Sequence, residues 1–579
     1  MSNSSVWASA YRTSITIKKC TQYCEDFAVR MTGPLDDRKR LNPGEIFWFA
    51  VIFVAQFAFA PLYTENQNTK FLHGLADAGK GYLAADWMAG TRDPLPVFSG
   101  IIQGFYGLDL QWLIDPALVL LWLVYAYSLV AIARRHFPVL EGRASRFLFA
   151  ALFILFNSNL LSMDEALAKQ YIVAENYFEP CVFGAFLLLG IERYLAGRLL
   201  IAAACFSLAA AVHPTYIPAG AVLVGVTGLL HLVHKRDPVR PLLAGGLFVL
   251  AVGPLVYRHV QLFAASSPEI WEQANHILSN IRIPHHTKVD RFLGVGAVLQ
   301  LLLMGLSLYF VRATRLFWVM LALYVPILGS LLWVAAAPND WLSFTTPWRL
   351  SVVLQPIAAT ILLAVLSLWL AQRFRQQETA ILRTAYGLLA VAVVAGAMQQ
   401  VKFLNDYHQS PAMAAMRLAA RDAGPGQVYL VPPRSRDFHA FRLETGLPIY
   451  INWKTHPYYD REILEWYRRY RLAEGFYDID DDGERCRVAD WLHRGEGVSH
   501  VVAPVGRSLA GCLAWSRLGV TRRFEIWAKR SAGARPPPAT PGAGLAHRPP
   551  AAPREPRRIR PRKQARRRGL WRWRRRTRR

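Results

Sequence analysis

The distribution of charge between consecutive apolar runs constrains this chain more than any other feature of its sequence. Eleven apolar stretches lie between Glu45 and Gln400, each about long enough to cross a bilayer. Nearly every second gap between them is rich in arginine and lysine, whereas the other gaps are longer and hold most of the acidic, histidine and aromatic residues. Only helices or closed barrels satisfy their backbone groups in lipid, and the alternation of barrel strands is absent. The pattern therefore predicts a mainly α, polytopic helical membrane protein.

The basic gaps also give these helices a direction. An Arg-Lys-Arg cluster at residues 38–40 precedes the first apolar run, and Arg134 and Arg135 follow the second. Because cytoplasmic loops carry an excess of lysine and arginine, we expect the N-terminus to be cytoplasmic. All the basic clusters then fall on one side of about eleven transmembrane helices. This count predicts that the C-terminal region lies outside the cytoplasm.

The same count divides the chain into four parts. Residues 1–44 are expected to form a cytoplasmic N-terminal segment. Residues 45–400 form the predicted transmembrane domain, with a long first outer loop at residues 63–113. Residues 401–530 have a soluble composition and are predicted to be a small extracytoplasmic α/β domain. Residues 531–579 are rich in arginine and proline and cannot form a core, so we expect a disordered tail.

Short strand-like and helix-like runs occur in the predicted α/β domain. Residues 427–431, 448–452, 498–503 and 523–528 have the composition of strands, and residues 460–474 have the spacing of an amphipathic helix. These runs alternate in a way that favours a small mixed domain.

Two of the six cysteines, Cys486 and Cys512, fall in this same domain. A disulfide between them can form if the domain lies in an oxidising compartment. Two cysteines alone define no disulfide framework, so free thiols are the alternative.

The net charge of +27 does not indicate nucleic-acid binding by the whole protein. About 17 arginine and lysine residues stand against the single Glu555 in residues 531–579, so more than half of the excess lies in the tail. The alternative to a merely disordered tail is a polybasic patch that binds anionic lipid or phosphate polymers. We therefore expect membrane lipids, and no nucleic acid, as partners.

The first outer loop has the richest chemistry. Glu65, Asn66 and Gln67 come directly after the first predicted helix, and Asp86 and Asp93 follow in the same loop. A carboxylate there could act as a general base on an acceptor hydroxyl, and the amides could bind a sugar or help to hold a divalent cation. The alternatives are a carboxylate at an interfacial helix end for Glu65 and a turn-initiating residue for Asp93.

Cationic candidates lie in three other predicted outer loops. Lys169, His213 and Arg349 could each contact a phosphate. Lys169 could instead pair with neighbouring acids, His213 could belong to a plain turn, and Arg349 could reach the lipid headgroups. His285 and His286 are adjacent and lack the i, i+4 spacing of a helical metal site, which disfavours metal binding there.

These residues and their layout resemble the C-type (GT-C fold) membrane glycosyltransferases. The resemblance implies a long, acidic first outer loop in which Glu65 matches the catalytic base by position, and Asp86 or Asp93 a second acidic site. The family commonly shows an aspartate or two acids spaced by one residue, whereas Asn66 and Gln67 follow Glu65 here. The resemblance further implies a polyprenyl-phosphate sugar as donor. The segment Phe441 to Lys454 also resembles uncharacterised bacterial membrane proteins, and we expect the chain to lie in the bacterial inner membrane.

The leading hypothesis is thus a sugar transferase at the extracytoplasmic face, with Glu65 and Asp86 as catalytic residues and the other named candidates as substrate-binding residues. The first alternative is a transporter or flippase of a lipid-linked or anionic substrate. Few charges lie in the middle of the apolar runs and no internal repeat is visible, which argues against this alternative. The second alternative is a non-catalytic membrane scaffold.

Overall fold

The computed structural model describes residues 43–530, except residues 159, 162–164, 174–175 and 338. The predictions for the N-terminal segment before Pro43 and for the tail after Arg530 lie outside the described residues.

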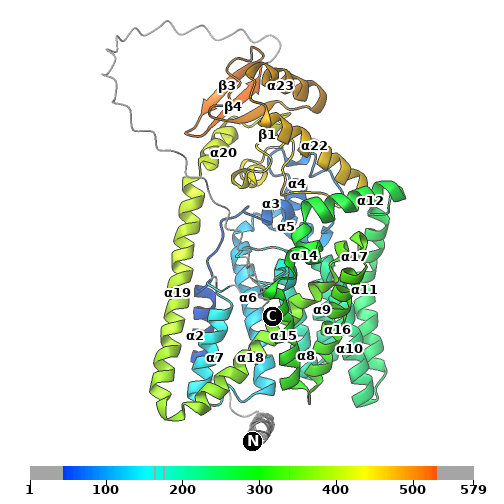
Figure 1. Cartoon of the computed structure of the whole chain (residues 1–579), viewed down its shortest axis with the longest axis vertical. Helices are drawn as coiled ribbons and strands as arrows, with labels where there is room; N and C mark the ends of the chain where they lie inside the picture. The colour runs from blue at the N-terminus through cyan, green and yellow to red at the C-terminus, as the bar shows by residue number, and fades with distance from the viewer. Residues whose placement is uncertain (1–42, 159, 162–164, 174–175, 338, 531–579) are drawn as a thin grey trace, which may run out of the picture. The chain divides into compact units, whose positions relative to one another are not determined.

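Each of the eleven predicted apolar runs contains a helix, which confirms the polytopic helical class (Figure 1). Six segments in the described part of the chain are long and apolar enough to cross a membrane by length and composition; three shorter apolar helices accompany them. The number of crossings and their direction remain predictions. The helices are α2 (Pro43–Ala55), α6 (Ile114–His136), α7 (Arg143–Phe156), α8 (Ala185–Leu195), α9 (Leu199–Val212), α10 (Ile217–Lys235), α11 (Val239–Leu262), α15 (Val295–Val311), α16 (Arg315–Ala336), α18 (Ser351–Arg373) and α19 (Glu378–Gln409).

Helix α6 illustrates why these runs fold as helices. Its long apolar body begins with Asp115 in the first turn and ends with Arg134, Arg135 and His136 in the last turn. An acid at the start and cations at the end complement the helix dipole. Because basic residues are enriched in cytoplasmic loops, the same cations also predict that this end of α6 faces the cytoplasm.

The short helices between these long ones are α3 (Gln67–Lys70), α4 (Leu72–Asp77) and α5 (Pro96–Gly107) in the first outer loop, and α12 (Pro268–His276), α13 (Pro284–Thr287), α14 (Val289–Phe292) and α17 (Asp340–Thr345) in later loops. Figure 1 shows the labelled ones toward one end of the long helices, and α13 contacts α14 and α17. The predicted outer loops therefore gather at a common end.

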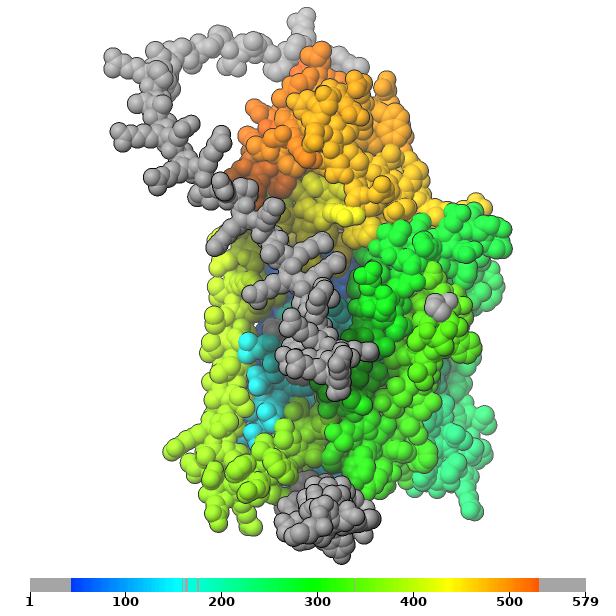
Figure 2. Space-filling model, in the orientation of Figure 1, coloured from blue at the N-terminus to red at the C-terminus, as the bar shows by residue number. Residues whose placement is uncertain are grey.

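The C-terminal region packs against these outer loops. Helix α12 contacts α22 (Asp460–Asp478), and Ser266 donates hydrogen bonds of 2.7 Å to both carboxylate oxygens of Asp460. The guanidinium of Arg92 lies 3.4 Å from the ring centroid of Tyr459. In the space-filling view the two regions adjoin (Figure 2). At the other end of the long helices, away from the C-terminal region, Arg146 of α7 pairs with Glu45 of α2 at 3.1 Å.

A four-stranded sheet with the order β1-β2-β4-β3 forms the centre of the C-terminal region. β1 (Tyr429–Leu430) is parallel to β2 (His500–Pro504), which is antiparallel to β4 (Phe524–Lys529); β4 is antiparallel to β3 (Trp515–Val520). Three of these strands fall in predicted runs; β3 was not predicted. Around the sheet lie α20 (Pro411–Arg421), α21 (Phe441–Thr445), α22 and α23 (Asp482–Glu496).

Helix α22 buries one face of an amphipathic pattern, through Ile463, Trp466 and Tyr470. Cys486 and Cys512 form a disulfide next to this core. Of the two alternatives that the sequence left open, the structure adopts the disulfide, as is typical of proteins in an oxidising compartment.

A contact between two glycines joins the first outer loop to the C-terminal region. The backbone N–H of Tyr82 donates to the carbonyl of Gly446 at 2.7 Å. A Cβ on Gly81 would lie 2.5 Å from that carbonyl oxygen, and Gly81 has a φ of +56°. Gly79 also has a positive φ, +74°, but a Cβ there would meet nothing within 4 Å. Gly79 therefore has only the positive φ, whereas Gly81 has both the positive φ and the close contact with Gly446.

We expect Gly79→Ala to destabilise the protein by about 1–2 kcal/mol through the left-handed backbone alone. Gly81→Ala should add a further ~1–3 kcal/mol, because the methyl group overpacks the junction. Thermal unfolding in detergent and limited proteolysis of the junction measure both effects. If both variants lost the same amount of stability, the close contact between Gly81 and Gly446 would not be important for the junction.

Candidate functional site

Glu65 lies in a turn after α2 whose backbone has an uncommon conformation. Tyr63 and Glu65 have φ angles of 66° and 41°, in the left-handed region that non-glycine residues seldom occupy. Side chains from the following residues hold this turn: Gln67 Oε1 accepts from the Tyr63 N–H at 2.9 Å, and Asn68 Nδ2 donates to the Glu65 carbonyl at 2.6 Å. Backbone strain held in this way clusters at functional sites.

The carboxylate of Glu65 is accessible and ionised. Its side chain is 43% exposed, and Lys454 Nζ lies 3.2 Å from its Oε2. Partial burial raises the pKa of Glu65, but the charge and hydrogen bond of Lys454, with the charge of Arg436, outweigh burial and hold that pKa below its ordinary value. Glu65 therefore carries its charge at neutral pH.

Arg282 supports Lys454 from a different loop. Its Nη2 donates to the Lys454 carbonyl at 2.6 Å, and its guanidinium lies 5.4 Å from the ring centroid of Trp453. Burial lowers the pKa of Arg282 to about 10. Its Nε is buried and has no hydrogen-bond partner among the described residues. A buried cation with an unused donor is suited to receive an anion.

Arg349 presents a second unused donor. It lies in the short helix Pro347–Leu350, which the indole of Trp348 fixes to the α13 loop by donating to the His286 carbonyl at 3.0 Å. The buried Nε of Arg349 also lacks a partner in the described part of the chain. The sequence alternative of an arginine that only reaches lipid headgroups does not explain this buried donor.

The histidines around these cations are neutral. Burial, together with His285, Arg349 and Arg282, lowers the pKa of His286 to about 3, although its bond to a backbone carbonyl opposes the shift. Burial, with Lys454 and other cations, lowers the pKa of His439 to about 4, although Glu65 opposes it. The positive charge of the site therefore resides on lysine and arginine.

Shared histidine neighbours show that these cations belong to one region. Lys70 and Arg349 both help to lower the pKa of His213, and Arg349 and Arg282 that of His286. Arg282 acts in the same way on the pKa of His285 together with Lys169, and on the pKa of His439 together with Arg436. Cations from several segments have no carboxylate within 4.0 Å among the described residues. These are Lys70, Lys169, Arg282, Arg349 and Arg436. We call this group the cation cluster; together with Glu65 and Lys454 it forms the candidate site.

The structure gives several predicted site residues a role in holding the loop. Gln67 is 1% exposed and its Nε2 donates to the Phe178 carbonyl at 3.1 Å. Asn66 Nδ2 donates to the hydroxyl of Tyr171 at 2.9 Å and to Glu179 at 3.3 Å. Both amides thus already bind protein groups.

Asp86 and Asp93 also have protein partners. Asp86 is buried, and its Oδ2 accepts from Arg442 Nε at 2.7 Å and from the Ile449 N–H at 2.9 Å. Asp93 Oδ1 accepts from the Leu95 N–H at 2.8 Å, as a turn-initiating aspartate does. We therefore leave Asp86 and Asp93 out of the proposed chemistry.

The remaining predicted residues lie in or beside the cation cluster. Lys169 is exposed on a backbone with a φ of 58°. His213 is buried, and its Nε2 lies 2.9 Å from Thr215 Oγ1. Lys454 and Arg282 were not predicted as site residues. No local sequence signal distinguished Arg282, since the loop before α13 also holds Glu269 and Glu272.

Within the described residues, no group of three or more histidine, cysteine, aspartate or glutamate side chains could hold a metal ion.

Residues 412–473 match a family model described as a domain of unknown function, DUF6798. This segment contains Lys454, His439 and Arg442. Comparison with curated protein sequences finds no match.

Two solved structures are similar to most of the chain. One is ArnT from Cupriavidus metallidurans bound to undecaprenyl phosphate, with 15% identity, coverage of 86% of this chain and 100% of that chain, and a TM-score of 0.47. The other is the apo state of the same protein, with 15% identity, coverage of 85% and 99%, and a TM-score of 0.44.

Proposed function

We propose that this chain is a glycosyltransferase of the bacterial inner membrane that transfers a sugar from a polyprenyl-phosphate donor to an acceptor hydroxyl at the extracytoplasmic face. The observation that carries the proposal is the occurrence together of one accessible, ionised carboxylate and several cations that have no carboxylate partner among the described residues. An acceptor hydroxyl needs a base, and a departing phosphate needs positive charge. The candidate site supplies both.

In the proposed reaction, Glu65 accepts the proton of the acceptor hydroxyl. The acceptor oxygen forms a bond to the anomeric carbon, and the bond from that carbon to the phosphate oxygen breaks. The phosphate leaves with the electron pair as polyprenyl phosphate. Arg349 and Arg282, whose Nε–H groups have no partner among the described residues, stabilise the charge that develops on it through charge-assisted hydrogen bonds. The disulfide between Cys486 and Cys512 supports an extracytoplasmic site.

Reconstitution in liposomes tests the reaction class. A polyprenyl-phosphate sugar carrying a labelled sugar is supplied with an extract of candidate lipid and glycan acceptors. We expect label to appear in a new covalent product together with free polyprenyl phosphate. Movement of the intact labelled lipid between leaflets without a new product would contradict the proposal and favour the transporter alternative.

The donor phosphate should bind through Arg349. We expect Arg349→Met to weaken binding of polyprenyl phosphate by about 10- to 100-fold, because a hydrogen bond to a charged group contributes about 1.5–3 kcal/mol. Titration of the purified protein in detergent measures this loss. Arg291→Met is the matched control, since Arg291 is 69% exposed, lies near the same end and pairs with Asp290. Equal binding by all three proteins would contradict the assignment of Arg349.

A further inference from the structure

A large cavity lies at the opposite end of the long helices from Glu65. Its volume is about 1620 Å³, and its lining comes mainly from α2, α6, α7 and the loop between α6 and α7. Glu192 and Leu195 of α8, residues 313–315 before and at the start of α16, and Tyr386 and Leu389 of α19 complete the lining. Pockets for small soluble ligands usually measure about 300–1,000 Å³, so this space is large for such a ligand.

The walls of the cavity are mostly apolar. Ile46 and Trp48 of α2 contribute side chains that are 51% and 62% exposed, and Tyr127 of α6 is 52% exposed. Exposed apolar surface of this kind, on helices that belong in a bilayer, is stabilised by contact with hydrocarbon at about 25 cal/mol per Å² removed from water. The walls therefore suit an alkyl chain.

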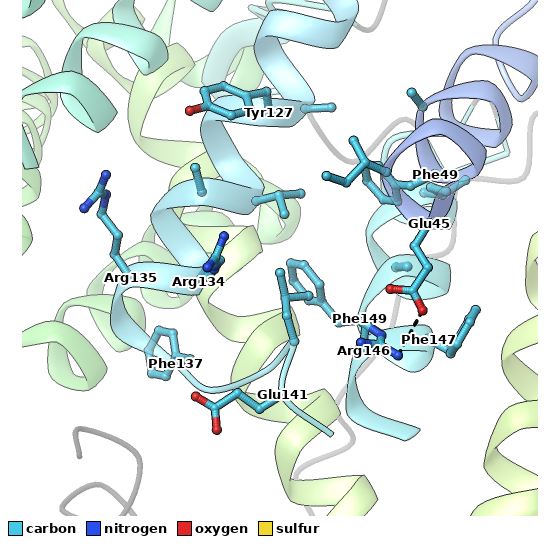
Figure 3. Close-up of a pocket in the computed structure, with 18 of the residues that line it drawn as sticks. Glu45, Phe49, Tyr127, Arg134, Arg135, Phe137, Glu141, Arg146, Phe147 and Phe149 are labelled. Atoms are coloured by element: carbon cyan, nitrogen blue, oxygen red, sulfur yellow. Dashed lines mark ion pairs between the residues drawn. The ribbon is translucent and has the colours of Figure 1, made fainter. Parts of the chain in front are cut away.

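Charged side chains surround the same cavity. Figure 3 shows Arg134 and Arg135 on one side of the opening and Arg146 with Glu45 on the other. Glu45 pairs with Arg146 at 3.1 Å, and Glu192 with Arg135 at 2.8 Å.

Arg315 also lines the cavity, and its side chain has no ion pair among the residues that the structure describes. Among the charged lining residues, the arginines outnumber the carboxylates: they are Arg134, Arg135, Arg146 and Arg315 against Glu45, Glu141 and Glu192. Basic clusters next to a membrane helix attract anionic lipid headgroups. The cavity thus combines apolar walls with an excess of positive charge at its rim.

We propose that this cavity binds an anionic phospholipid of the adjoining membrane leaflet. The acyl chains lie along α2, α6 and α7, and the phosphate contacts Arg315 and Arg134. Apolar walls without rim charge would take any lipid; the uncompensated Arg315 selects a net negative headgroup. The site is separate from Glu65, so its test is independent of the proposed glycosyl transfer.

Native mass spectrometry of the full-length protein in mild detergent tests the proposal. The probes are phosphatidylglycerol and phosphatidylcholine with identical acyl chains. We expect phosphatidylglycerol to bind more tightly, and Arg315→Gln to weaken it by about fivefold while leaving phosphatidylcholine unchanged, since one basic residue at a membrane surface contributes about that factor. Arg375→Gln is the matched control, because Arg375 is exposed and lies outside the lining.

A second variant tests the acyl-chain part. Ala150→Phe places a ring in the cavity from α7 and should weaken binding of both lipids. Equal affinity of the wild-type protein for the two lipids, or an unchanged affinity of Arg315→Gln for phosphatidylglycerol, would overturn the proposal. So would glycerol phosphate binding as tightly as the intact lipid, because the cavity would then take a free phosphate.

Discussion

Replacing Glu65 by glutamine should lower the rate of sugar transfer by about 10²- to 10⁴-fold, the usual contribution of a positioned general base. Glutamine keeps the size of the side chain and can still accept a hydrogen bond from Lys454, but it cannot accept the proton of the acceptor hydroxyl. Donor binding should change far less than turnover, because the cation cluster that would receive the phosphate is intact. Single-turnover transfer with the reconstituted protein measures the effect.

Glu272→Gln is the matched control for this prediction. Glu272 is an exposed carboxylate on α12, at the same end of the helices, and belongs to no described ion pair. The control should transfer sugar at the wild-type rate. If Glu65→Gln, at matched protein level, also transfers at that rate, Glu65 is not the base.

The pH dependence provides a second readout of the same carboxylate. The pKa of Glu65 lies below its ordinary value of 4.5, so the base is ionised above that pH and loses activity only as the pH falls through its lowered pKa. Lys454→Met removes the largest opposing charge, so the acidic limb of the pH–rate profile should move to higher pH. A profile that does not move would show that Lys454 does not tune the base.

Features that depend on one segment could be predicted from the sequence. The apolar runs predicted the long helices, because a helix that crosses a bilayer needs enough length and hydrophobicity within one continuous segment. The position of Glu65 followed from the end of the first run. The pattern of α20 was also available, since Ala412, Ala415, Met416 and Ala419 are spaced as one buried helix face, although the sequence analysis did not use it.

Features that depend on distant contacts could not be predicted. Lys454 reaches Glu65 across 389 residues of sequence, and no local pattern indicates such a pair. Gln67 was predicted to bind substrate because an amide has the same hydrogen-bonding groups whether its partner is a sugar or the backbone. Only the burial of Gln67 in the structure shows that its amide binds the backbone instead of a sugar. Strand β3 was missed because it is partly exposed and its register shifts between Arg517 and Gly519.

The ion pair between Asp86 and Arg442 should be the most sensitive point of the junction between the first outer loop and the C-terminal region. The side chains are 0% and 1% exposed, and Nη1 and Nη2 of Arg442 have no hydrogen-bond partner in the described part of the chain. Asp86 is therefore the group that neutralises the buried charge of Arg442. Asp86→Asn should destabilise the junction by about 3–5 kcal/mol, because it leaves a buried cation unpaired.

A double-mutant cycle separates the charge from the packing at this pair. Arg442→Met in the background of Asp86→Leu should recover most of the stability lost by Asp86→Leu alone, since apolar residues of similar volume often replace a buried pair without loss. Thermal unfolding in detergent and proteolysis of the junction report the coupling. Arg468→Met is the matched control: Arg468 is 45% exposed and pairs at the surface with Glu465 of α22 and Glu496 of α23, so its loss should amount to about 1 kcal/mol. Equal losses of stability for Arg468→Met and Asp86→Asn would show that the buried pair does not hold the loop. A double variant no more stable than Asp86→Leu would show the same. Other contacts with the loops would then have to fix the C-terminal region.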